Sequence, residues 1–124
     1  MKKETTLAVG AILGSVAVGI GAFGAHGLAA FLEKAGRTET FELAVRYHFY
    51  HALALIATGL AMHHYSSKAL TYSAWLFISG ICLFSGSLLV LCFTGLRALG
   101  MVTPLGGLCF IAGWIALAFG VYKK

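Results

Sequence analysis

Long runs without charged residues dominate the chain. Four such runs contain no Asp, Glu, Lys or Arg: Thr5–Leu32, Tyr47–Ser67, Ala69–Leu96 and Ala98–Tyr122. Each is longer than the roughly 20 residues that an α-helix needs to cross a hydrocarbon core. Barrel strands would alternate apolar and polar residues over about ten positions, and these runs do not. The pattern therefore predicts spanning helices, because lipid offers no partner to unpaired backbone groups.

The expected fold is all-α: a four-helix transmembrane bundle forming a single integral membrane domain over residues 1–124. A short interfacial amphipathic helix is expected between the first and second spans, because charged and apolar residues mix from Thr38 onward. The first run is expected to be retained rather than cleaved as a signal peptide, since it is long enough to span. The predicted spans are about Leu7–Leu28, His48–Tyr65, Leu70–Phe93 and Met101–Tyr122.

Composition supports lipid as the main solvent of this chain. Its 124 residues are 60% hydrophobic and 10% charged, with a mean hydropathy of +0.90, whereas soluble domains carry about 25% charged residues. The net charge is +5, but the basic residues stand at the ends and junctions of the apolar runs. A nucleic-acid surface would need a continuous basic face, so nucleic acid is not an expected partner. Membrane lipids are an expected partner, because basic residues at the ends of the apolar runs suit anionic headgroups.

The distribution of Lys and Arg predicts that both termini are cytoplasmic, because basic residues favour that side. With four spans, the termini share a side with the turn at Lys68. The basic residues on that side are Lys2, Lys3, Lys68, Lys123 and Lys124, and those on the other are Lys34, Arg37, Arg46 and Arg97.

Small residues spaced by four predict close packing of helix backbones in lipid. The candidates are Gly10, Gly14 and Gly21 in the first span and Ala112, Ala116 and Gly120 in the fourth. The same faces would suit a homo-oligomer or another membrane-protein partner. Gly19–Gly24 also matches the letters of a dinucleotide fingerprint, but no strand precedes it, so nucleotide binding is not expected.

Polar residues near the start of the second span are the candidate ligand-binding site, because ionisable groups within spans are costly and often functional. The candidates are His26, Arg46, Tyr47, His48, Tyr50 and His51. His48 and His51 are three apart and share roughly one helix face, and His26 is expected to approach them inside the bundle. Three interpretations stay open: a structural polar cluster, a ligand or proton site, and a metal site such as zinc, for which a fourth ligand is missing.

The function expected first is binding or permeation of a small ligand, ion or lipid at this His/Tyr/Arg cluster. The alternative is a structural or assembly protein that oligomerises through its glycine-rich faces. An enzyme comes third, because the chain contains no Asp and no Glu within its spans. No cofactor is expected.

Several segments resemble one known family along nearly the whole chain. They are Gly21–Leu28, Arg46–Leu55, Phe84–Leu88, Thr103–Gly107 and Gly113-Trp114. The chain resembles domain-of-unknown-function family 423, the YgdD-like small bacterial inner-membrane proteins. The resemblance implies a multi-span protein of the bacterial inner (cell) membrane. It places His26, His48 and His51 within signature segments, and it supplies no catalytic residue.

Overall fold

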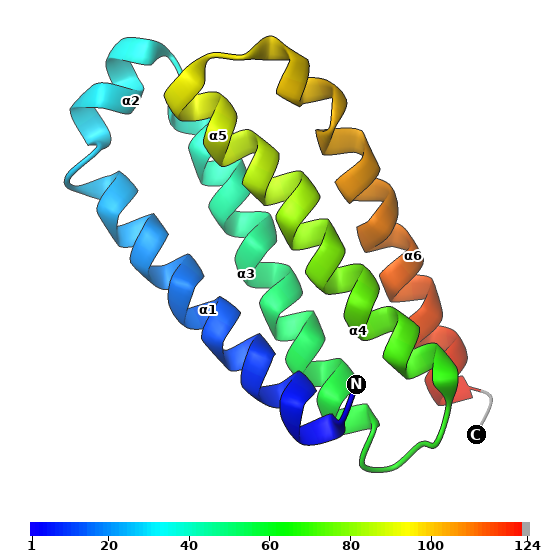
Figure 1. Ribbon diagram of the computed structural model, residues 1–124. Helices are drawn as coiled ribbons and strands as arrows, with labels where there is room; N and C mark the ends of the chain where they lie inside the picture. The colour runs from blue at the N-terminus through cyan, green and yellow to red at the C-terminus, as the bar shows by residue number, and fades with distance from the viewer. Residues whose placement is uncertain (123–124) are drawn as a thin grey trace.

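A computed structural model describes residues 1–122, and within them the regular structure is entirely helical (Figure 1). The all-α prediction is confirmed for this part of the chain. Lys123 and Lys124, which entered the charge argument, lie outside the described residues. The elements are α1 (Lys3–Ala25), α2 (Ala29–Ala35), α3 (Thr38–Ala61), α4 (Lys68–Gly80), the π-helix η1 (Ile81–Ser85), α5 (Gly86–Thr94), the 3₁₀-helix η2 (Arg97–Met101) and α6 (Thr103–Tyr122).

Three helical segments are long and apolar enough to cross a membrane: Lys3–Ala25, Lys68–Thr94 and Arg97–Tyr122. The second of these is α4, η1 and α5 in unbroken succession. With 24 residues, α3 is comparable in length to these segments, which have 23, 27 and 26 residues. It is more polar, because charged residues occupy its first turns and the His/Tyr segment follows them.

The first connection differs from the prediction in two ways. The first helix ends at Ala25 rather than at Leu28, and a separate short helix, α2, which was not expected, follows it. The amphipathic segment from Thr38 runs directly into the second long helix, as predicted. Gly36 ends α2 in the left-handed conformation, with φ of 69°. No Pro occurs in the following residues and the one Gly, Gly59, lies near their end, so α3 runs from Thr38 to Ala61 as one helix and ends before the expected Tyr65.

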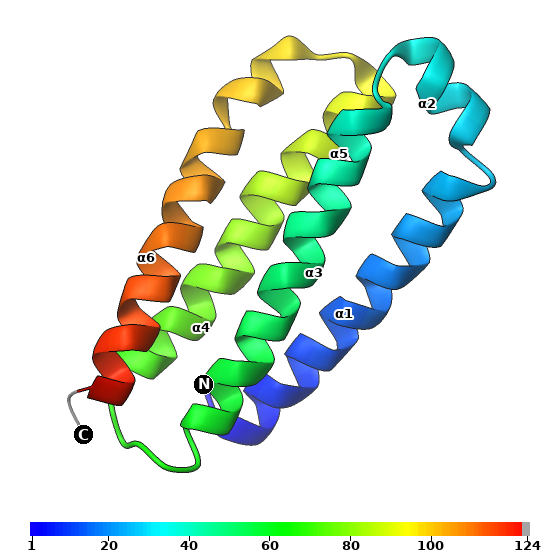
Figure 2. The same ribbon diagram turned by 180° about the vertical axis from the view of Figure 1, so that it is seen from behind.

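The long helices form a row in the order α1, α3, α4–α5 and α6 (Figures 1 and 2). Helix α1 packs along α3, and α6 packs along α4 and η1, while α3 also contacts α4, η1 and α5. Helix α2 lies between the C-terminal end of α1 and the start of α3 and contacts both helices. The start of α1 and the end of α6 lie at the opposite end of the molecule.

Glycines in α6 receive large side chains from the antiparallel helix beside it. A Cβ at Gly113 would lie 2.8 Å from the ring of Phe77, and one at Gly120 would lie 2.5 Å from Leu70. A Cβ at Gly106 would lie 2.7 Å from the Cα of Phe84. These glycines and their partners both repeat every seven residues, which is the period of helices that pack along their whole length. Ala112 and Ala116 lie off this row and are half-buried.

The α1–α3 pair uses small residues of α1 in the same way. A Cβ at Gly10 would lie 2.7 Å from Ile56, and one at Gly21 would lie 3.1 Å from Val45. Gly14 is looser, since its nearest neighbour is Phe49 at 3.8 Å. Gly24 receives the ring of Phe41. The α1 glycines therefore serve packing within the chain.

Hydroxyl groups add polar contacts between the helices. Ser73 of α4 donates a hydrogen bond of 2.9 Å to the carbonyl of Gly113 in α6, and its Oγ lies 3.4 Å from that of Thr58 in α3. Ser87 of α5 and Thr103 of α6 are joined by a hydroxyl pair 2.7 Å apart. Such bonds hold helices together in lipid, where the hydroxyls have no water to bind.

Candidate functional site

His51 is buried between α3 and α6, with both ring nitrogens in hydrogen bonds. The indole Nε1–H of Trp114 donates to His51 Nε2 at 3.1 Å. An indole can only donate, so Nε2 is the unprotonated nitrogen, and Nδ1–H donates to the Tyr47 carbonyl 2.7 Å away. The ring therefore holds one proton, as the neutral Nδ1–H tautomer. In this arrangement no lone pair of the ring is left for a metal.

Aromatic rings surround His51. Its ring stacks on Phe110 with centroids 3.5 Å apart and planes within 8° of parallel. Tyr47 stacks on Phe84 of η1 at 5.0 Å, and Phe77 of α4 meets Trp114 edge-on at 5.2 Å. The rings join α3, α4, η1 and α6 at one level of the bundle.

His48 is also buried but faces a different neighbour. It is 5% exposed, it lies beside the backbone of Leu13 in α1, and its Nε2 has no hydrogen-bond partner. Ser85 of η1 is 1% exposed, and its Oγ likewise lacks a partner. The two histidines thus point to different helices, although the spacing of three predicted a shared face.

The expected approach of His26 to His48 or His51 was wrong. His26 is exposed at the C-terminal end of α1, just beyond Gly24, which packs on Phe41. His48 lies seven residues further along α3 than Phe41, about 10 Å at the helical rise. Within residues 1–122, no group of three or more His, Cys, Asp or Glu side chains is placed to hold a metal ion.

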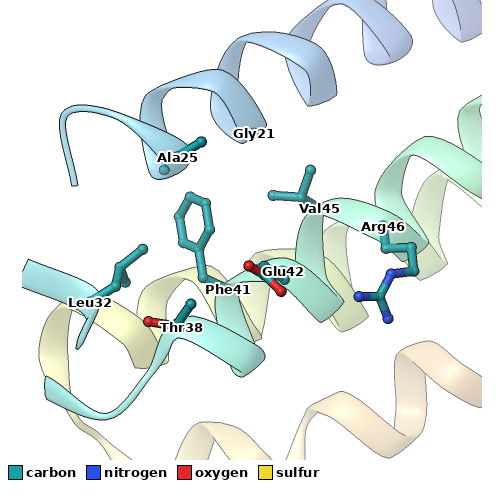
Figure 3. Close-up of a pocket in the computed structure, with 9 residues that line it drawn as sticks. Gly21, Ala25, Leu32, Thr38, Phe41, Glu42, Val45 and Arg46 are labelled. Atoms are coloured by element: carbon teal, nitrogen blue, oxygen red, sulfur yellow. The ribbon is translucent and has the colours of Figure 1, made fainter. Parts of the chain in front are cut away.

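Arg46 is exposed and borders a cavity of about 290 Å³ where α1, α2 and α3 meet. Figure 3 shows Phe41 and Val45 reaching from α3 toward α1, with Glu42 beside them. The Arg46 side chain extends away from α1, and no interaction is drawn between its guanidinium and the Glu42 carboxylate. The lining residues are Gly21, Gly24, Ala25, Leu32, Thr38, Phe41, Glu42, Val45 and Arg46.

An apolar groove of about 410 Å³ continues from this cavity along α1 and α3. Both hollows share Gly21, Val45 and Arg46, so the Arg46 side chain lies between them, and the groove is bordered by its apolar part. The groove presents no polar surface of its own. Its lining residues are Ala17, Val18, Gly21, Ala22, Val45, Arg46, Phe49 and Tyr50.

A third hollow, of about 360 Å³, opens on the outer side of α3. Glu39, Glu42, Leu43 and Arg46 line it. Arg46 therefore belongs to all three hollows, and Glu42 to two of them. Four of the six candidate residues divide into two places: Tyr47 and His51 in the aromatic core, and Arg46 and Tyr50 on the surface formed with α1. His48 lies buried beside α1, and His26 is exposed at its end.

Several residues of these places were not among the sequence candidates. Glu42 is four residues before Arg46, a spacing that places the two on one helix face but does not indicate a cavity. Trp114 and Phe110 are four apart on α6, a spacing that places them on one face, but no local pattern links either residue to His51. Phe41 and Val45 line the cavity only because Gly24 and Gly21 of α1 leave room beside them.

Comparison with known proteins identifies the chain's relatives. Residues 20–107 match a family described as "Protein of unknown function (DUF423)". The chain belongs to this family. No solved structure matches it. A UPF0382 membrane protein of Staphylococcus saprophyticus is 43% identical over 93% of this chain and 94% of its own length.

Two further relatives give the same result across distant bacteria. The UPF0382 membrane protein YwdK of Bacillus subtilis is 41% identical over 93% of this chain and 94% of its own length. A UPF0382 membrane protein of Haemophilus influenzae is 38% identical over 98% of this chain and 97% of its own length. The family resemblance and the membrane character of the chain are confirmed.

Proposed function

We propose that this protein binds a phospholipid in its transmembrane region, with the phosphate on Arg46 and one acyl chain in the apolar groove between α1 and α3. The position of Arg46 carries the proposal, since it lines both the polar cavity and the apolar groove. A guanidinium offers forked donors that match phosphate oxygens. A side chain that joins a polar pocket to an apolar groove suits a ligand that is itself charged at one end.

The proposed setting is a four-span bundle in the bacterial inner membrane, in which α3 spans the membrane in addition to the three segments described above. In support, α3 is as long as α1 and packs along it. Val45 contacts Gly21, four residues before α1 ends at Ala25. Arg46 therefore lies about 6 Å inside that end of the bundle. This is a shallow depth at which a guanidinium reaches headgroups.

The lipid proposal predicts that Arg46→Gln loses the bound lipid. Charge-assisted hydrogen bonds are worth about 1.5–3 kcal/mol, so affinity should fall roughly tenfold or more. The measurement is native mass spectrometry of protein extracted in mild detergent. Arg97→Gln is the matched control, because Arg97 is also exposed but borders neither hollow.

A second variant tests the groove without changing charge. Val18 is 61% exposed and lines the groove, so Val18→Trp should fill it and displace the acyl chain. Val16→Trp is its control, because Val16 lies on another face of α1 and outside the groove. Retention of the same lipid by both Arg46→Gln and Val18→Trp would contradict the proposal.

The four-span arrangement predicts that both ends of the chain lie in the cytoplasm. Alkaline phosphatase fused after residue 124 should be inactive, because the enzyme requires export, and a fusion at Gly36 should be active. Green fluorescent protein at the same positions should give the opposite pattern. Activity of the phosphatase after residue 124 would contradict this topology.

The assembly function receives less support. The glycines of α1 and α6 that face neighbouring helices contact α3, α4 and η1 of the same chain. An oligomer through these faces remains a prediction, and size-exclusion chromatography with light scattering measures it.

A further inference from the structure

The charges of α3 are arranged in a fixed order along the helix. Glu39 and Glu42 come first, nearer the end of the bundle, and Arg46 follows one turn deeper. All three are exposed and line one hollow. Glu42 and Arg46 also line the cavity of Figure 3, where no interaction is drawn between their charged groups. Each is therefore available to a ligand rather than used up by the other.

This order matches the charges of an aminophospholipid. In such a lipid the phosphate lies next to the glycerol, and a two-carbon linker carries a primary ammonium outward. Glu42 and Arg46 are four residues apart, about 6 Å along the helix. A phosphate on Arg46 therefore places the ammonium at the level of Glu42, with Glu39 beyond it.

The acidic groups also discriminate among headgroups. With Glu39 and Glu42 beside Arg46, the hollow contains two carboxylates and one guanidinium. A headgroup of net negative charge meets repulsion there, which disfavours glycerol and diphosphatidyl headgroups. A quaternary ammonium has no N–H to donate, and it is bound mainly by several aromatic faces. The hollow has no aromatic face, because its lining residues are Glu39, Glu42, Leu43 and Arg46.

We infer that the lipid bound at Arg46 is a phospholipid with a primary amine, of the phosphatidylethanolamine type, whose ammonium is held by Glu42. This inference rests on the proposed function. Arg46 supplies the attraction to phosphate that phospholipids share, and Glu42 supplies the selectivity for a primary amine.

The test titrates delipidated protein in detergent with three lipids of identical acyl chains, carrying ethanolamine, choline or glycerol headgroups. Native mass spectrometry or tryptophan quenching by brominated chains gives each affinity. The native chain should bind the ethanolamine lipid on the order of tenfold more tightly than the other two, since the ammonium–carboxylate bond is charge-assisted. Glu42→Gln should weaken binding of the ethanolamine lipid more than binding of the choline lipid and so remove this preference.

Glu33→Gln is the matched control, because Glu33 is exposed on α2 and lines neither hollow. Helicity and the melting temperature of each variant establish that it is folded. Equal affinities for the three lipids, or preference for the glycerol lipid, with binding still dependent on Arg46 would overturn the inference and leave the proposed function standing. Binding that does not depend on Arg46 would overturn both.

Discussion

Gly106→Ala should destabilise the protein by about 1–3 kcal/mol, the usual cost of overpacking a tight contact. The added methyl group would lie 2.7 Å from both the Cα and the Cβ of Phe84. The backbone of η1 would have to move away, because a main-chain atom cannot rotate aside as a side chain can. Gly106→Leu should prevent α6 from docking altogether. Unfolding of the purified protein in mixed micelles, followed by circular dichroism, measures the loss.

Gly107→Ala is the control for this prediction. Its new methyl group would meet only the Phe84 ring, at 4.0 Å, which is ordinary van der Waals contact. Alanine is favoured over glycine in a helix by about 1 kcal/mol, so Gly107→Ala should be neutral or slightly stabilising. Equal stabilities of the two variants would show that α6 does not approach Phe84 through Gly106.

His51→Phe should cost about 1–3 kcal/mol, although it keeps an aromatic ring against Phe110. The loss comes from the Trp114 indole N–H, which would have no acceptor in a surrounding of apolar rings. Trp114→Phe should cost a similar amount, because it leaves His51 Nε2 without a donor. Reversible unfolding in mixed micelles again gives the free energies.

The double variant separates this hydrogen bond from simple ring packing. When both partners are replaced by Phe, no polar group is left unpaired, so the double variant should lose less than the two single losses added together. Trp75→Phe is the control, because Trp75 is 54% exposed and lies outside the aromatic cluster. Additivity within about 0.5 kcal/mol would mean that His51 and Trp114 are not coupled.

The glycines illustrate how far a local pattern leads. A spacing of four marked Gly10, Gly14 and Gly21 as packing residues, and in the structure all three face α3. In α6 the same rule selected Ala112, Ala116 and Gly120; Gly120 receives Leu70, but Phe77 packs on Gly113, which the rule did not select. Helices that pack along their full length repeat every seven residues rather than every four. Only the partner's large side chains show which small residues receive them.

The histidines show a second limit. His26, His48 and His51 are the ionisable residues that stand out between apolar runs, so the sequence suggested one shared site. The register of α1 against α3 decides otherwise, because it places Phe41, and not His48, opposite the end of α1. His51 instead accepts a hydrogen bond from Trp114, which is 63 residues away in the chain.

The sequence by itself determined that this protein lies in a membrane, that it is helical and roughly where each long helix lies in the chain. These are properties of single segments: an uncharged run of sufficient length must pair its own backbone groups in lipid, whatever lies beside it. The tertiary structure decided which faces meet, which histidine is satisfied and where a cavity forms beside Arg46. Those features depend on pairs such as Gly24 with Phe41 and His51 with Trp114. The partners are distant in the chain and come together only when the register between helices is set.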